Sequence, residues 1–451
     1  MKTRFVNKAG ALVGSGSAVA VARLSSLVFA AAQLPLLTRL LSPSEYSSVA
    51  LAIAIAAYFS LLSAESIILG FQRFPGSNEE RSNYSYAITR MITAVVIAGL
   101  LVVGAGYLLG RVEISAAFAG WGVGLAVNRV VSTGWLMWGR PWQYAWNLIG
   151  GTGARTAVLL ILILAGWNPL LSLGIAGLAS AAAALVLSPR IRVSKITWKS
   201  RPWPFSFGIN LALASLAYTV LTNGNLLLLT AFVASDRVGK YAAMSQVAAL
   251  SSGAVLGLVL TVAYPRLRLA WDKGVRAKVH AELVTLQLGC LFVASATIAL
   301  LYVANHFLLK LIVREQFVDG GVLALLIMAT AFAAMGQIES WNLQFQLEAG
   351  KVARGTGAAA LIGILITLGL ASVFREQGAA IGATIGFLAY LVILSSKANA
   401  SLLIICAVVA ALAISSSGSV MPSSDVVAYP ALAVAAITLV FAVRSFRAKR
   451  L

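Results

Sequence analysis

The stretch GVLALLIMATAFAAMGQIESWNLQFQL, residues 321–347, shows the pattern that decides the fold of this chain. Residues 321–336 carry no charged side chain, and an apolar run of about 20 residues is long enough to cross a bilayer as a helix. Similar runs recur through the 451 residues, of which 60% are hydrophobic and 11% charged, whereas soluble domains are about 25% charged. The sequence therefore predicts an all-α, polytopic membrane protein and excludes a soluble enzyme or a nucleic-acid-binding module.

The apolar runs predict fourteen transmembrane spans, arranged as two pseudo-symmetric six-helix lobes and two further helices. We expect an N-terminal lobe at 1–188, a basic cytoplasmic linker at 189–204, a C-terminal lobe at 205–396, and two extra spans with a basic tail at 397–451. The expected spans are 13–36, 46–71, 86–110, 115–138, 143–166, 169–188, 205–232, 241–264, 283–309, 321–347, 355–373, 378–396, 401–415 and 429–443. Repeated halves place the substrate site at their interface in many transporters.

The basic residues are distributed unevenly between the loops on the two sides of the predicted membrane. Lys and Arg total 34 against 14 Asp and Glu, which gives a net charge of +20. With the N-terminus inside, 23 of the 34 fall on inner segments and 7 on outer segments, as the positive-inside rule requires. We therefore expect both termini in the cytoplasm. The partner of these charges is then the anionic lipid of the membrane, and no nucleic acid is needed to explain them.

Two helical hairpins at corresponding positions of the two lobes carry related motifs. The first is LPLLTRLLSPSEY at residues 34–46, and the second ends in SDRVGKY at residues 235–241, with Tyr264-Pro265 closing the following span. These motifs resemble the polysaccharide-transporter, or O-antigen flippase, family of the multidrug/oligosaccharidyl-lipid/polysaccharide exporter superfamily. One departure is Ser47, which stands where that family commonly has glycine.

The resemblance implies a lipid-linked oligosaccharide flippase of the bacterial inner membrane. Such a protein moves a polyprenyl-pyrophosphate-linked oligosaccharide, for example an O-antigen repeat unit of lipopolysaccharide, from the cytoplasmic to the outer leaflet. The movement occurs by alternating access of the two lobes. The resemblance implies no enzymatic activity and no cofactor, and a glycan polymerase and glycosyltransferases are the expected partners.

Four arginines lie inside the predicted spans of the N-terminal lobe, where an ionisable group is costly and marks a candidate functional site. We expect Arg23, Arg129 and Arg155 at comparable depths near the middle of the membrane, and Arg90 about one turn inside its span. We interpret them as the lining of a cationic central cavity, because guanidinium groups bind phosphate bidentately and stay charged at physiological pH. Glu65, the only carboxylate in these spans, either pairs with Arg23 or Arg155 or couples transport to protons.

The end of the 321–347 run is polar on more than one face of the predicted helix. Glu339 and Asn342 share one face, and Trp341 lies on another. Such a surface suits sugar hydroxyls, and Trp341 can stack on a pyranose ring, so we assign these three residues to the substrate cavity. The alternative is a helix end among the lipid headgroups, where polar residues and tryptophan are common.

Two other functions stay open on the sequence. A cation-coupled multidrug exporter of the same superfamily would be expected to have twelve spans and an acidic site in the N-terminal lobe, whereas this lobe is rich in arginine and Glu65 is its one possible coupling group. A membrane-embedded glycan polymerase or ligase usually carries a large outer loop with catalytic residues, and the predicted outer loops are short. Histidine and cysteine offer no catalytic or metal-binding cluster: Cys290 and Cys406 sit in separate apolar stretches far apart in the sequence, and neither His280 nor His306 has a cysteine or carboxylate cluster nearby.

Overall fold

The computed structural model describes residues 2–73, 78–137, 140–188, 205–303 and 307–395. Within these ranges the regular structure is entirely helical, and ten helical stretches are long and apolar enough to cross a membrane. A further stretch in the third expected span, Val95–Leu108, is apolar but shorter. The prediction of an all-α, polytopic membrane protein is confirmed.

Six helices in the first part of the chain match the first six expected spans. They are α1 (Lys2–Leu40), α2 (Pro43–Arg73), α3 (Asn78–Leu108), α4 (Val112–Met137), α5 (Pro141–Leu164) and α6 (Pro169–Val186). Proline begins α5 and α6, at the position where its missing N–H costs no hydrogen bond. Asn168 caps α6, because its side chain accepts hydrogen bonds from the backbone N–H groups of Leu170 and Leu171.

Two turns of π-helix interrupt spans in the second part of the chain, and hydropathy predicted neither of them. One composite helix consists of α7 (Phe205–Thr219), η1 (Val220–Gly224) and α8 (Asn225–Leu229), and the other of α9 (Ser235–Ala248), η2 (Ala249–Gly253) and α10 (Ala254–Asp272). The remaining elements are α11 (Arg276–Val303), α12 (Phe307–Ile312), the 3-10 turn η3 (Glu315–Phe317), α13 (Gly320–Phe345) and α14 (Ala349–Leu394).

The helix α14 contains two of the expected spans, 355–373 and 378–396. They are separated at Arg375, whose φ of 55° and ψ of −127° lie outside the helical region. The expected spans 401–415 and 429–443 and the linker 189–204 lie outside the described residues. The total of fourteen spans therefore stays a prediction.

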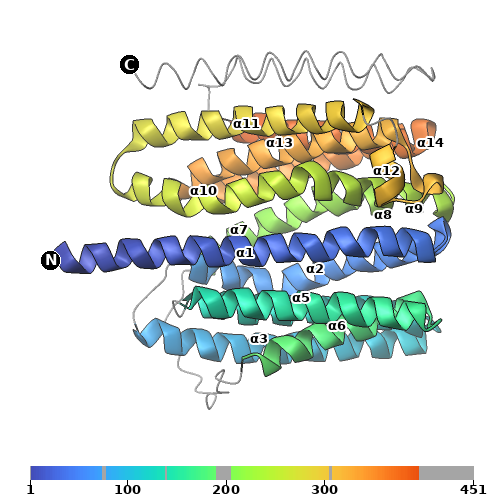
Figure 1. The fold of residues 1–451 in the computed structure, drawn as a ribbon, viewed down its shortest axis with the longest axis horizontal. Helices are drawn as coiled ribbons and strands as arrows, with labels where there is room; N and C mark the ends of the chain where they lie inside the picture. The colour runs from blue at the N-terminus through green and yellow to red at the C-terminus, as the bar shows by residue number, and fades with distance from the viewer. Residues whose placement is uncertain (1, 74–77, 138–139, 189–204, 304–306, 396–451) are drawn as a thin grey trace. The chain divides into compact units, whose positions relative to one another are not determined.

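The described helices belong to two compact units. The first unit comprises Met1–Leu40 and Ser48–Leu216, and the second comprises Leu41–Ser47 and Ala217–Leu451. In the first unit, α4 packs on α3, α5 and α6. The helix α1 packs on α5 (Figure 1). The valines of α4 form the core of this unit together with Trp135 and Tyr144. The exact lobe boundaries, 188 and 205, stay a prediction because the residues between them are not described.

The second unit is organised around α13, which packs on α9, α10, α11 and α14 (Figure 1). Its side chains are buried along almost its whole length. The segment Leu41–Ser47 from the first motif also belongs to this unit, and there Tyr46 packs edge-on against Phe317 with ring centroids 5.6 Å apart. Gly239 of the second motif lies against the Pro43 carbonyl so closely that a Cβ would not fit. The two related motifs therefore contact each other.

Candidate functional site

Arg155 projects from α5 onto an aromatic ring of the neighbouring α4. Its guanidinium carbon lies 4.6 Å from the ring centroid of Trp121, which is itself 4% exposed. A cation over the face of a tryptophan ring is held by the ring quadrupole, most strongly where water is excluded. The contact accounts for the orientation of Arg155 inside a span of 24 residues, Pro141–Leu164.

Two polar atoms at this position are buried and have no hydrogen-bond partner among the described residues. They are Nε of Arg155 and Oγ1 of the adjacent Thr156. Buried polar atoms are almost always satisfied, so an unsatisfied donor beside an unsatisfied hydroxyl calls for a specific explanation, such as water or a ligand. Arg155 as a whole is half-buried, so part of its side chain is accessible.

The side chains of Arg23 on α1 and Arg129 on α4 are exposed, in contrast to Arg155. Arg23 lies 17 residues before the end of α1 at Leu40, and Arg129 lies 17 residues after the start of α4 at Val112. Arg155 lies 9 residues before the end of α5 at Leu164, which is on the same side of the first unit. At 1.5 Å per residue this difference is about 12 Å. Counted along the helices, Arg155 is eight residues nearer that side than the other two, and the comparable depth of the three in the membrane stays a prediction. A guanidinium in the middle of a span is not tolerated by lipid, so the surfaces bearing Arg23 and Arg129 face water or protein.

The other two candidate residues of the N-terminal lobe, one acidic and one basic, are only partly described. Glu65 lies on α2 and Arg90 on α3, but their side chains lie outside the described part of the chain. Their proposed pairing and cavity roles therefore stay predictions.

A buried hydrogen-bond network ties α4, α5 and α6 together about two helical turns from Arg155. At its centre, the Asn147 amide donates to the backbone oxygen of Ala184 at 2.8 Å and to Oγ of Ser188 at 2.9 Å, and its oxygen accepts from Ser132 at 2.9 Å. Trp135 donates from Nε1 to the same Ser188 hydroxyl at 2.8 Å. These bonds fix the rotation of α5 against its neighbours and therefore the direction in which Arg155 projects.

The predicted sugar-binding residues of α13 are buried in the second unit. Glu339 is 4% exposed, and its Oε1 accepts a hydrogen bond of 2.7 Å from Nε2 of Gln287 on α11. Trp341 is 7% exposed and packs on Tyr264 with ring centroids 5.0 Å apart. Asn342 is 5% exposed and accepts a hydrogen bond from Gln346 at 3.2 Å. In this conformation Glu339 and Trp341 contact other helices of their own unit, Asn342 contacts the end of its own helix, and the role of all three toward sugars stays a prediction.

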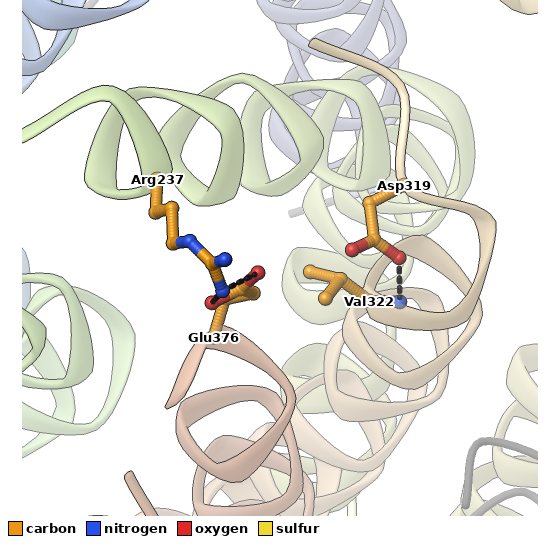
Figure 2. Close-up of polar contacts among 4 residues, drawn as sticks. All are labelled: Arg237, Asp319, Val322 and Glu376. Atoms are coloured by element: carbon orange, nitrogen blue, oxygen red, sulfur yellow. Dashed lines mark hydrogen bonds and ion pairs between the residues drawn. The ribbon is translucent and has the colours of Figure 1, made fainter. Parts of the chain in front are cut away.

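Sequence reasoning missed an ionic cluster where α9, α13 and α14 meet (Figure 2). Arg237 of α9 lies 3.3 Å from Oε1 of Glu376 on α14, and Asp319 caps α13 by accepting from the Val322 N–H at 3.0 Å. Burial raises the pKa of Asp319 above its usual value, and the Glu376 carboxylate adds to this rise, while the Val322 bond and Lys240 oppose it. Neither hydropathy nor the motif containing Arg237 indicated that these residues meet.

No protein-family model matches this chain, and no curated protein matches its sequence. Among solved structures, lipid II flippase MurJ in an inward closed conformation aligns with a TM-score of 0.65 at 12% identity, over 97% of this chain and 100% of that chain. An outward-facing multidrug resistance MATE family transporter of the MOP superfamily aligns with a TM-score of 0.56 at 13% identity, over 91% of this chain and 97% of that chain. A eukaryotic MATE transporter gives a TM-score of 0.52 at 14% identity, with coverage of 97% and 99%. The chain therefore shares the fold of these transporters along nearly its whole length.

Proposed function

We propose that this chain, which has the fold of MurJ and the MATE transporters, is a flippase for a polyprenyl-pyrophosphate-linked oligosaccharide. The observation that carries the proposal is Arg155, a guanidinium inside a span with a buried Nε donor that no described residue uses. In this function the chain is a multi-pass protein of the bacterial inner membrane with both termini in the cytoplasm. Its cargo is an O-antigen or other polysaccharide repeat unit, and it works beside a glycan polymerase and glycosyltransferases.

Stacking of the Arg155 guanidinium on Trp121 would keep its hydrogen-bonding edge for an anion. A guanidinium is planar, and its N–H bonds lie in that plane, so stacking on a ring uses its face and leaves its edge. That edge matches two oxygens of a phosphate group, and hydrogen bonds between ionised partners are about twice as strong as neutral ones. The hydroxyl of Thr156 adds a donor at the same place.

Arg23 and Arg129 extend this cationic character to a second level of the first unit. A pyrophosphate that moves between the levels would keep a guanidinium within reach during a displacement of about 12 Å, the length of eight helical residues. Arg90 belongs to the same proposed path. The sugar contacts at Glu339, Trp341 and Asn342 would form in a conformation in which α13 is exposed.

Flipping of a fluorescent polyprenyl-pyrophosphate glycolipid in proteoliposomes tests this function. We expect Arg155→Ala to slow flipping by about 10- to 100-fold, which corresponds to the ~1.5–3 kcal/mol of a hydrogen bond to a charged group. Arg155→Lys keeps the charge but not the planar edge, so it should recover only part of the rate. Arg111→Ala removes an exposed arginine at the start of α4 and serves as the matched control. Equal flipping by all four proteins, with no loss of protein, would refute the proposal.

The MATE neighbours make a multidrug exporter the second candidate. The same vesicles distinguish the two functions when loaded with a lipophilic cationic drug. Drug efflux without glycolipid flipping would support the exporter. A path with three intramembrane arginines repels cations, which is why the flippase is preferred.

A further inference from the structure

We infer that Glu339 and Gln287 form a proton-binding site inside the second unit, in which the Glu339 carboxyl group is protonated in this conformation. The site lies where α11 packs on α13, and its two side chains are 4% and 1% exposed. The Nε2 of Gln287 donates to Oε1 of Glu339 at 2.7 Å, while Oε1 of Gln287 is buried and has no hydrogen-bond partner among the described residues.

The orphaned amide oxygen is what requires the proton. An ionised carboxylate only accepts hydrogen bonds, so it can satisfy the NH2 group of an amide but never its oxygen. A protonated carboxyl group both donates and accepts, and it can therefore pair with both edges of one primary amide. Binding one proton converts a single hydrogen bond into a two-bond acid–amide pair and satisfies the buried oxygen.

Exchanging the positions of the amide oxygen and nitrogen of Gln287 also requires a proton on Glu339. Its oxygen would then face Oε1 of Glu339 at 2.7 Å, and two oxygen atoms approach to that distance only when a proton lies between them. The amide nitrogen would become the group without a partner. The protonated acid is the only state of Glu339 that serves both edges of Gln287.

An ion pair between α10 and α11 lies near this site. Tyr264 of α10 packs on Trp341, and Arg266, two residues further, forms a 3.6 Å ion pair with Glu282 of α11. Glu282 lies five residues before Gln287, which is about 7.5 Å along the helix. Cys290 is the buried titratable group of α11 on the other side of Gln287.

Of the other elements packed on α13, α14 contributes two titratable groups near this level, Tyr390 and the exposed Arg354, whose Nε donates to the Gly350 backbone oxygen at 3.3 Å. Tyr390 of α14 forms a hydrogen bond with Ser340, the neighbour of Glu339. The elements α9 and η2 pack toward the opposite half of α13, where Gly253 contacts Thr330. Carboxyl groups inside membrane spans are typical members of proton relays in pumps and transporters.

The proton is released when α11 and α13 separate, because the ionised group is stable only where water can reach it. The balance is a simple dissociation: the carboxyl O–H bond breaks, the proton leaves to water, and the carboxylate remains. In the last step, which rests on the proposed function, uptake and release at this site couple glycolipid flipping to a pH gradient.

Infrared difference spectroscopy on the full-length protein in lipid tests the site without any substrate. We expect the carbonyl stretch of a protonated carboxylic acid, with a shift in D2O, and its loss in Glu339→Gln. The matched control is Glu282→Gln, which changes the ion-paired glutamate of the same helix contact and should leave the band in place. Gln287→Leu should keep the acid band but move it, because the acid loses its amide partner. A wild-type spectrum without this band, or a band that Glu339→Gln leaves unchanged, would overturn the inference.

Flipping rates at different pH values test the coupling step separately. Glu339→Gln should flatten the pH profile in proteoliposomes, whereas Glu282→Gln should keep the wild-type profile. A pH-dependent rate that Glu339→Gln leaves unaltered would overturn the coupling. If the wild-type protein flips no glycolipid, the proposed function fails, while the infrared result still decides whether the proton is bound.

Discussion

A methyl group placed between α4 and α6 should separate the two helices of the first unit that are in the closest backbone contact. Gly124 of α4 lies against Gly177 of α6, and a Cβ at Gly124 would be 2.1 Å from the Gly177 carbonyl oxygen and 2.8 Å from its Cα. Ordinary contact begins at 3.4 Å, so the helices would have to move apart by more than 1 Å. The atoms in the way belong to the backbone, which cannot yield by changing a rotamer.

The expected loss of stability follows from two opposing terms. Overpacking in a tight core costs typically 1–3 kcal/mol, and we expect about 3 kcal/mol because only backbone atoms oppose the methyl group. Alanine gains about 1 kcal/mol over glycine from helix propensity, which leaves a net loss of about 2 kcal/mol for Gly124→Ala. The matched control is Gly104→Ala in α3, where a Cβ meets nothing within 4 Å. It should gain about 1 kcal/mol for the same propensity reason.

Thermal unfolding of both variants in detergent measures the difference. A gap of about 3 kcal/mol corresponds to roughly 6–12 °C in Tm for a unit of this size, with Gly104→Ala the more stable protein. Intrinsic tryptophan fluorescence follows the transition, because Trp121 and Trp135 are both buried in α4. If Gly124→Ala melted at or above the temperature of Gly104→Ala, the close contact between α4 and α6 would be refuted.

Two other contacts and the predicted membrane orientation lead to measurable effects. Asp319→Asn keeps an N-cap acceptor but removes the ionisable group. Since the fold raises the pKa of Asp319, its protonated form contributes stability at low pH that is lost as the pH rises through that pKa, so the Tm advantage of the variant should grow as the pH rises above about 4. A constant difference would contradict this. Asn147→Ala breaks two donated hydrogen bonds and should lower stability by about 2 kcal/mol in the same melting assay, and an unchanged Tm would count against the network. In a cysteine-free background, a cysteine at Ser42 should react with an impermeant thiol reagent outside cells, whereas one at Gly274 should react only after permeabilisation. The reverse pattern would invert the predicted orientation.

Hydropathy was sufficient to predict the fold class. A backbone exposed to lipid must satisfy its own hydrogen bonds, so membranes are spanned only by α-helices and closed β-barrels, and runs of about 20 apolar residues indicate helices. The expected spans 115–138, 143–166 and 169–188 match α4, α5 and α6 closely. A hydropathy profile does not show which carbonyl each backbone N–H group bonds to. The π-helical turns at Val220–Gly224 and Ala249–Gly253 were therefore missed.

The partners of the candidate residues could not be read from the sequence. Gln287 lies 52 residues before Glu339, and the contact depends on how α11 rotates against α13. Trp121 was not singled out for Arg155, because a tryptophan in a span is as consistent with packing as with binding a cation. A single sequence reveals which side chains are costly in a membrane, but not which helix faces meet.

The membrane potential provides an independent reason to prefer the anionic cargo for this arrangement of charges. The described spans of the first unit carry arginines, and the interior of α13 in the second carries one acid with an amide partner. With the predicted orientation and a potential negative inside, each negative charge that moves outward gains ~2.3 kcal/mol per 100 mV, and a proton moving inward gains the same. Export of a pyrophosphate in exchange for a proton is then favoured twice by the potential. Export of a drug cation through the same path would be opposed by the potential and by every arginine on the way.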